Sequence, residues 1–179
     1  AGPVDYTNWA EGIRVGRSYV SDGMTHLMDL TVGGVSPGEP GTDGVNSQLG
    51  RDAAQPVGVT ARVASRIDEE PNVDIANRPL ASQPYWHAER ARIGDSRRIP
   101  VELIVNGEAV ATQEIEADGS IQEIKFTVNI ERSSWVALRV FPSAHTNPVF
   151  VVVDDKPIRA SRRSAEWCLE AVDVCWESK

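Results

Sequence analysis

This 179-residue chain has 26 aspartate and glutamate side chains but few of the histidines and cysteines that metal and proton-transfer sites also use: His26, His87, His145, Cys168 and Cys175. A hydrolytic zinc site needs three converging protein ligands and an open position for water. The histidines are far apart in sequence and belong to no His-x-His or Asp-x-His pair. Ser36 stands in the chain's one G-x-S-x-G sequence, residues 34–38, but this sequence lies at a predicted turn and loop and not at the strand-to-helix turn of a nucleophile elbow. From spacing alone we assign no catalytic residue and no metal ligand.

His87 and Glu89 come nearest to the spacing of a metal site. Residues 85–93 read as a strand with one charged and one smaller apolar face, and residues two apart on a strand share a face. Two ligands without a third favour a solvated polar face over a metal site.

A second cluster, His145-Thr146-Asn147, lies in a predicted loop between two strongly apolar strands and precedes Pro148. The structural interpretation is a turn in which Thr146 and Asn147 hydrogen-bond to nearby backbone. The functional interpretation is a loop that faces a binding partner, because loops on rigid scaffolds often carry function. These three residues are candidate binding residues.

Arg17 is the fourth candidate binding residue. With Arg14 it flanks a glycine turn, where the two guanidinium groups could hold an anionic substrate. They could instead pair with the nearby carboxylates of Asp5, Glu11 or Asp22, and this pairing is the preferred interpretation.

Trp86 and Trp135 are candidate platforms on which a sugar ring could stack, as aromatic side chains of sandwich modules sometimes provide. Trp135 begins a strongly apolar strand, so burial is preferred for it. A carbohydrate-binding module would need at least one of Trp86, Tyr85 or Trp9 to be exposed.

The predicted strands of residues 98–153 form the scaffold around which these candidate residues are arranged. An apolar-alternating run leads to Asn106-Gly107, a strong hairpin signal because a type I′ turn needs positive φ at both central residues. A second turn is predicted at Asp118-Gly119, and further alternating strands follow it. The pattern predicts a β-meander within a mainly β, antiparallel two-sheet β-sandwich of roughly seven to nine strands.

Upstream, residues 6–13 predict a short N-terminal helix that Thr7 or Asn8 could cap and Gly16 could end. The other elements predicted before residue 98 are strands at 17–22, 25–32 and 57–65, a hairpin turn at Gly33-Gly34, and a long surface loop at 36–56.

The C-terminal segment SAEWCLEAVDVCWES, residues 164–178, predicts an amphipathic helix that Ser164 caps and that packs against the sandwich. Cys168 and Cys175 lie two turns apart on its apolar face, about 10 Å, which is too far for a bridge between them. We expect both to be small buried hydrophobic residues.

The formal net charge of −8 and the pI of about 4.9 argue against nonspecific nucleic-acid binding, which needs lysine and arginine to displace phosphate counterions. No apolar run approaches the roughly 20 residues of a membrane span, and no signal peptide opens the chain. We therefore expect no nucleic-acid partner and no membrane partner, while the compartment stays undetermined.

Three stretches carry a family resemblance. WAEGIRVGRSYVSDG at residues 9–23, followed by VGGVSPG at 32–38, is similar to the element that closes the catalytic domain of CehA/McbA-type metallohydrolases, a branch of the polymerase-and-histidinol-phosphatase (PHP) superfamily. VELIVNG at 101–107 resembles a strand of the β-sandwich that follows that domain. SSWVALRVFPSAHTNPVFVVV at 133–153 resembles the terminal strands of the same sandwich. Together these stretches occur in the family's order and span most of the chain.

The resemblance implies three parts: residues 1–35 as the tail of an upstream catalytic domain, 36–160 as the sandwich, and 161–179 as a helix packed on it. It also implies a divalent metal cluster in the upstream domain, held by His-x-His and Asp-x-His motifs that this chain lacks. No catalytic residue, metal ligand or cofactor is therefore carried over to the chain itself.

We expect a non-catalytic accessory sandwich that supports or shapes the active site of a larger hydrolase, with the upstream catalytic domain as its partner. The alternatives are a carbohydrate- or ligand-binding module and a self-sufficient enzyme that uses His145 or His87. The opening Ala1-Gly2-Pro3 reads as mid-protein sequence, so we expect a fragment of a parent protein, and parents of this family are often exported. Apolar surface around Trp9 and Ile13 is expected to drive self-association of the isolated piece.

Overall fold

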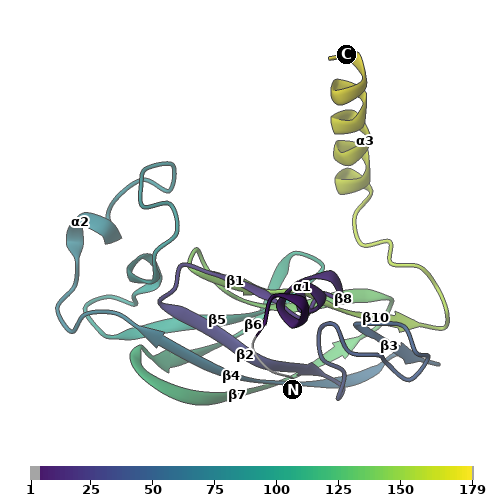
Figure 1. Cartoon of the computed structure of the whole chain (residues 1–179), viewed down its shortest axis with the longest axis horizontal. Helices are drawn as coiled ribbons and strands as arrows, with labels where there is room; N and C mark the ends of the chain where they lie inside the picture. Colours follow the sequence, from purple (N-terminus) through teal and green to yellow (C-terminus); the bar gives the residue numbers. More distant parts are fainter. Residues whose placement is uncertain (1–4, 179) are drawn as a thin grey trace.

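The computed structural model describes residues 5–178, and it is mainly β, with two sheets, a short N-terminal helix and a C-terminal helix (Figure 1). This confirms the predicted fold class. Residues 1–3, which suggested a mid-protein start, lie outside the described residues.

Seven strands of the described chain form the larger sheet: β1 (Tyr19–Ser21), β3 (Gln48–Arg51), β5 (Arg98–Val105), β6 (Glu108–Glu116), β8 (Ser134–Val140), β9 (Ala144–Thr146) and β10 (Val149–Val153). β8 lies at its centre, with β5 and then β6 on one side. On its other side β8 pairs with both β9 and β10, which in turn carry β1 and β3. All of these pairs are antiparallel except β10 with β3.

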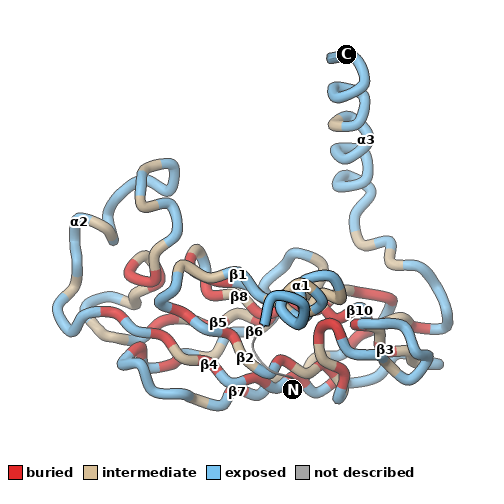
Figure 2. Tube along the Cα trace, in the orientation of Figure 1, coloured by how far each residue is buried: buried red, intermediate tan, exposed pale blue. Residues whose placement is uncertain are grey.

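The smaller sheet has three antiparallel strands in the order β2-β4-β7: β2 (Thr25–Val32), β4 (Gln55–Arg66) and β7 (Asp118–Ile130). Along β4, Val57, Val59, Ala61 and Val63 are buried and alternate with exposed residues, which confirms the strand predicted at 57–65. The two sheets enclose one hydrophobic core, and burial is concentrated in the strands (Figure 2).

The hairpin predicted at Asn106-Gly107 joins β5 to β6, and both turn residues have positive φ, 54° and 96°. The meander predicted after it is wrong. At Ala117 the chain crosses from one sheet to the other, so β7 pairs with β4 and not with β6. A fully buried Ala117 marks this crossing, because the core lies between the two sheets.

Glutamine side chains bridge the gap between β6 and β7. The backbone N–H of Glu116 donates to Gln122 Oε1 (3.1 Å), and Gln122 Nε2 donates to the Glu116 carbonyl (2.7 Å). Gln113 Oε1 accepts a further hydrogen bond from the Lys125 N–H (3.4 Å). Side-chain amides therefore stand in for part of the backbone ladder that these two strands lack.

The strands on either side of Gly23 enter different sheets, since β1 pairs with β9 and β2 pairs with β4. The expected boundary at residue 35 thus falls after two strands that are built into the two sheets. The turn at Gly33-Gly34 forms with positive φ at both residues, but beyond it only the single bridge between Val32 and Val35 continues the hairpin.

The interpretation of residues 36–56 as a long surface loop is wrong in part, because the segment contains β3. This strand runs parallel to β10, with Leu49 opposite Val151, and the Leu49 side chain is fully buried in the core.

Residues 67–97 form a long excursion with two short helical turns, α2 (Val73–Ala76) and η1 (Ala88–Ala91). The strand predicted at 85–93 is therefore wrong. The side chain of His87 caps η1 by accepting from the Glu89 N–H (3.1 Å), and buried Ala88, Glu89 and Ala91 fix this turn against the sandwich.

The N-terminal helix α1 (Tyr6–Arg14) is capped by Asp5, whose Oδ1 accepts from the Asn8 N–H (2.8 Å). The cap thus lies one residue before α1, not at Thr7 or Asn8. Gly16, with φ of 85°, follows the helix as expected.

The C-terminal helix α3 (Arg162–Glu177) begins three residues earlier than predicted, because Ser161 and not Ser164 accepts the capping bond (3.1 Å). The predicted packing of this helix on the sandwich is not observed. None of its described residues is buried, both cysteines are exposed, and α3 projects away from the sheets (Figures 1 and 2). Residues 154–161 carry the chain out from β10, which is why the helix does not return to the core. Within residues 5–178, no helix has the length and apolar character needed to cross a bilayer.

Candidate functional site

The four candidate binding residues gather at one edge of the larger sheet, because β1 pairs with β9. Tyr19 lies opposite Thr146 and Val20 lies opposite His145, so the segment that follows Arg17 runs beside residues 145–147. His145 and Thr146 belong to the short strand β9 and not to a loop.

Thr146 and Asn147 have structural roles at this edge. Thr146 is buried, and its Oγ1 accepts from the backbone N–H of Leu138 in the central strand (3.0 Å). Asn147 Nδ2 donates to the Gly16 carbonyl (3.0 Å) and to Ser18 Oγ (3.1 Å), which ties the segment between α1 and β1 to the end of β9. The structural interpretation predicted hydrogen bonds to nearby backbone, whereas these partners, two of them backbone groups, lie eight residues or more away in the sequence.

Arg14 forms the expected ion pair with Glu11, and its guanidinium Nη2 lies 2.6 Å from Glu11 Oε1. The hydrogen bonds from Arg14 lower the pKa of the Glu11 carboxyl below its ordinary value. The Arg17 side chain is exposed, and the residue's role here is in its backbone. The Arg17 N–H donates to the Gly12 carbonyl (2.8 Å) and closes the turn after α1.

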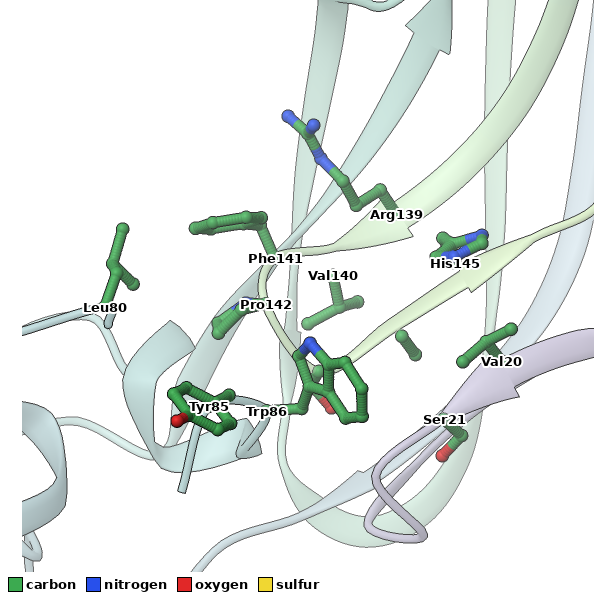
Figure 3. Close-up of a pocket in the computed structure, with 12 residues that line it drawn as sticks. Val20, Ser21, Leu80, Tyr85, Trp86, Arg139, Val140, Phe141, Pro142 and His145 are labelled. Atoms are coloured by element: carbon green, nitrogen blue, oxygen red, sulfur yellow. The ribbon is translucent and has the colours of Figure 1, made fainter. Parts of the chain in front are cut away.

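His145 lines an open cleft of about 600 Å³ between the β8–β9 turn and the excursion at residues 67–97. Figure 3 shows the Trp86 indole within this cleft, with Tyr85 and Pro142 toward one side and Val20 and His145 toward the other. The lining is mainly apolar and aromatic: Val20, Leu80, Tyr85, Trp86, Val140, Phe141, Pro142 and Ala144, with Ser21, Ser143, Arg139 and His145 as its polar members.

Arg139 is the cationic group of the cleft, and two neighbours orient it. Its Nε donates to Glu102 Oε2 (2.7 Å), and its guanidinium carbon lies 5.4 Å from the centre of the Phe141 ring. A guanidinium over an aromatic face is a favourable cation–π arrangement. The cleft therefore offers stacking surface together with hydrogen-bond donors at its rim, which suits a ligand with one apolar face and polar edges.

The aromatic wall depends on how the excursion at 67–97 is held. The Ala88 N–H donates to Asp22 Oδ2 (2.6 Å), so the residue that follows β1 fixes the turn that carries Trp86. Close by, the carboxylate of Glu89 pairs with the guanidinium of Arg92 (Nε to Oε1, 2.6 Å) in a buried contact.

The same contacts show that the solvated polar face preferred for His87 and Glu89 is wrong for Glu89, whose side chain is buried. The Glu89 carboxylate faces Arg92 and accepts from the Asn72 N–H (2.8 Å), while His87 Nδ1 accepts from backbone. Both side chains therefore cap and anchor the excursion. Across the described part of the chain, no three His, Cys, Asp or Glu side chains gather as metal ligands would.

Trp86, Tyr85 and Trp9 are all exposed, whereas Trp135 is only partly exposed at the start of β8. Sequence reasoning missed Phe141 and Arg139 as site residues. The alternation of β8 was the available signal, because its core residues Val136, Leu138 and Val140 place residues 139 and 141 on the opposite face.

No protein-family model matches this chain, and no curated protein matches it either. The resemblance to the metallohydrolases stays a prediction.

Proposed function

We propose that this chain is a non-catalytic β-sandwich accessory domain of a larger PHP-like metal-dependent hydrolase, and that it supports and shapes the active site of a neighbouring catalytic domain. The observation that carries the proposal is the exposed apolar face of α1, together with the hydrogen bonds that tie the link after this helix to the sandwich edge. The divalent metal and its ligands belong, in this proposal, to the catalytic domain.

The apolar face of α1 is formed by Tyr6, Trp9 and Ile13, all exposed, and the Tyr6 and Trp9 rings lie 5.9 Å apart. No residue of α1 is buried. Exposed contiguous apolar surface marks interaction sites in soluble proteins. A large aromatic such as Trp9 is also the residue type most often found to dominate the binding energy of an interface.

The link that follows α1 is fixed to the sandwich from two sides. Asn147 holds the carbonyl of Gly16, and Gly38 lies so close to Arg17 that a Cβ at Gly38 would be 2.7 Å from the Arg17 nitrogen. A partner on α1 would therefore take a defined position relative to the sheets. Since β1 continues from this link and its Val20 lines the cleft, that partner would be placed near the cleft mouth.

The docking prediction concerns Trp9→Ala. The parent coding sequence is first read for His-x-His and Asp-x-His motifs upstream, and that catalytic domain is co-expressed with this chain as a separate polypeptide. We expect the two to bind, and Trp9→Ala to weaken binding about thirtyfold, as loss of roughly 2 kcal/mol at a hot spot implies. Isothermal titration calorimetry measures the dissociation constants.

Trp167→Ala is the matched control, because Trp167 is 68% exposed on α3 and Trp9 is 62% exposed on α1. Equal binding by the wild-type and Trp9→Ala chains would contradict the docking, and an upstream sequence without these metal motifs would contradict the proposed family. The isolated chain is expected to retain no stoichiometric metal and to hydrolyse neither phosphoesters nor carbamates.

A second candidate function is carbohydrate binding in the cleft, and the exposed Trp86 ring favours it. A neutral sugar would stack on this ring and would meet Arg139 and His145 at the rim. We expect Trp86→Ala to weaken the binding of a glycan selected on an array by about tenfold. Trp167→Ala is again the control, and equal affinity of wild-type and Trp86→Ala chains would contradict this function.

A further inference from the structure

The side chains of α3 are sorted by charge around the helix. Ala165 and Val172 are seven residues apart, as are Cys168 and Cys175, and these four occupy the a and d positions of two consecutive heptads. In a coiled coil the a and d positions form the seam that faces the partner helix.

The acidic residues of these two heptads all lie away from that seam. Glu166 and Asp173 fall at the b positions, and Glu170 and Glu177 fall at the f positions. At the positions that flank the seam, e and g, these two heptads carry Leu169, Ala171, Trp176 and Ser178, all uncharged. The first turn of the helix has Arg162 at the preceding e position, where it pairs with Glu166 of the same helix (2.7 Å). Two copies of this helix can therefore meet along their seams without bringing like charges together, although the chain as a whole carries a charge of −8.

The seam is accessible, since none of the described residues of α3 is buried and both cysteines are exposed. A 16-residue helix with no buried residue among those described is marginal in water, because most helix stability in proteins comes from packing an apolar face. The helix therefore gains stability from a partner that covers the seam.

We propose that this partner is a second copy of the chain, and that two α3 helices associate in parallel and in register. In that arrangement each seam residue meets its own counterpart, so Cys168 faces Cys168 and Cys175 faces Cys175 of the other copy. An antiparallel pair would instead place a against d, which sets Cys168 against Val172. The disulfides that form between two copies therefore show whether the α3 helices associate and whether they run parallel or antiparallel.

The test uses the whole chain as the two variants Cys168→Ser and Cys175→Ser, each of which keeps one cysteine, with diamide as oxidant. Two thiols form one disulfide and give up two protons and two electrons, which reduce the N=N bond of diamide to the hydrazine. We expect each variant to cross-link to a disulfide dimer on a non-reducing gel. In a mixture of the two variants with different tags, we expect about tenfold less mixed dimer than self-dimer, because each remaining cysteine then faces a serine.

Val172→Glu and Val174→Glu form the matched pair of variants in the wild-type cysteine background. The two valines are similarly exposed, 62% and 66%, and receive the same charge, but only Val172 lies on the seam. We expect Val172→Glu to slow cross-linking about tenfold, because it brings two carboxylates together in the seam, and Val174→Glu to leave the rate within about twofold. Circular dichroism checks that both variants keep the helix.

Equal rates of cross-linking for Val172→Glu and Val174→Glu would contradict the assignment of Val172 to the helix–helix contact. Mixed dimers in statistical proportion would overturn the parallel register. The absence of any dimer with either single-cysteine variant would overturn the association itself.

Discussion

Replacing Arg92 by alanine is expected to lower the free energy of unfolding by about 3–5 kcal/mol, because it leaves the buried Glu89 carboxylate without its charge partner. Both side chains are only 2% exposed. The Arg92 guanidinium also donates to the carbonyls of Ser96 (2.9 Å) and Asp68 (2.5 Å), so it holds three parts of the excursion at residues 67–97. The Arg92→Ala substitution therefore removes the ion pair with Glu89 and the hydrogen bonds to Ser96 and Asp68 together.

Thermal unfolding measures the effect, and for a chain of this size we expect the midpoint to fall by roughly 10 °C. Arg98→Ala is the control. Its partner Glu114 lies at the same 2.6 Å, but these side chains are 54% and 43% exposed, so water screens the pair and we expect a loss below about 1 kcal/mol. Similar losses for Arg92→Ala and Arg98→Ala would mean that burial does not set the strength of the Glu89–Arg92 pair.

Replacing Leu49 by alanine is expected to cost about 2–5 kcal/mol, as large-to-small substitutions in a packed core do. Leu49 is fully buried on β3, opposite Val151 of β10, and it packs so closely that a Cβ on Gly33 would be 2.6 Å from its Cδ2. Its removal leaves a cavity where the parallel strand joins the core. Urea denaturation gives the difference in free energy of unfolding.

Val45→Ala, in the same segment but at an exposed position, is the control for Leu49→Ala, and we expect it to change stability by less than about 0.5 kcal/mol. If the two variants were equally stable, residues 36–56 would be a surface loop after all.

The contrast between β4 and β3 explains how much of the fold the sequence could predict. β4 places apolar residues at every second position from Val57 to Val63, and Asn106-Gly107 fixes a hairpin locally, so both were predicted correctly. β3 has Leu49 as its single large apolar residue, and it pairs with a strand about 100 residues later. No local pattern could reveal it.

For the candidate site too, the sequence predicted the features that depend on local patterns and missed those that depend on distant parts of the chain. His145 was singled out from its neighbours in the sequence, but the cleft that it lines depends on the β1–β9 pairing and on the Glu89–Arg92 contact. Glu89 and Arg92 look like solvated charges in the sequence, since burial of an ion pair depends on the chain that folds over it. The direction in which α3 projects could not be predicted either. An amphipathic pattern indicates that one face of a helix packs against a partner, but it does not identify that partner.

The glutamines between β6 and β7 have a consequence for how this protein behaves at high concentration. Free backbone groups along the rim of a sheet can template growth by extended segments of other molecules, which is one route to amyloid. Here the amide of Gln122 occupies both the N–H and the carbonyl of Glu116, and Lys125 adds an exposed charge to the neighbouring strand. The edge strands β6 and β7 of the two sheets thus cover part of each other's free backbone groups. This protects the 13-residue strand β7 from fibrillar stacking.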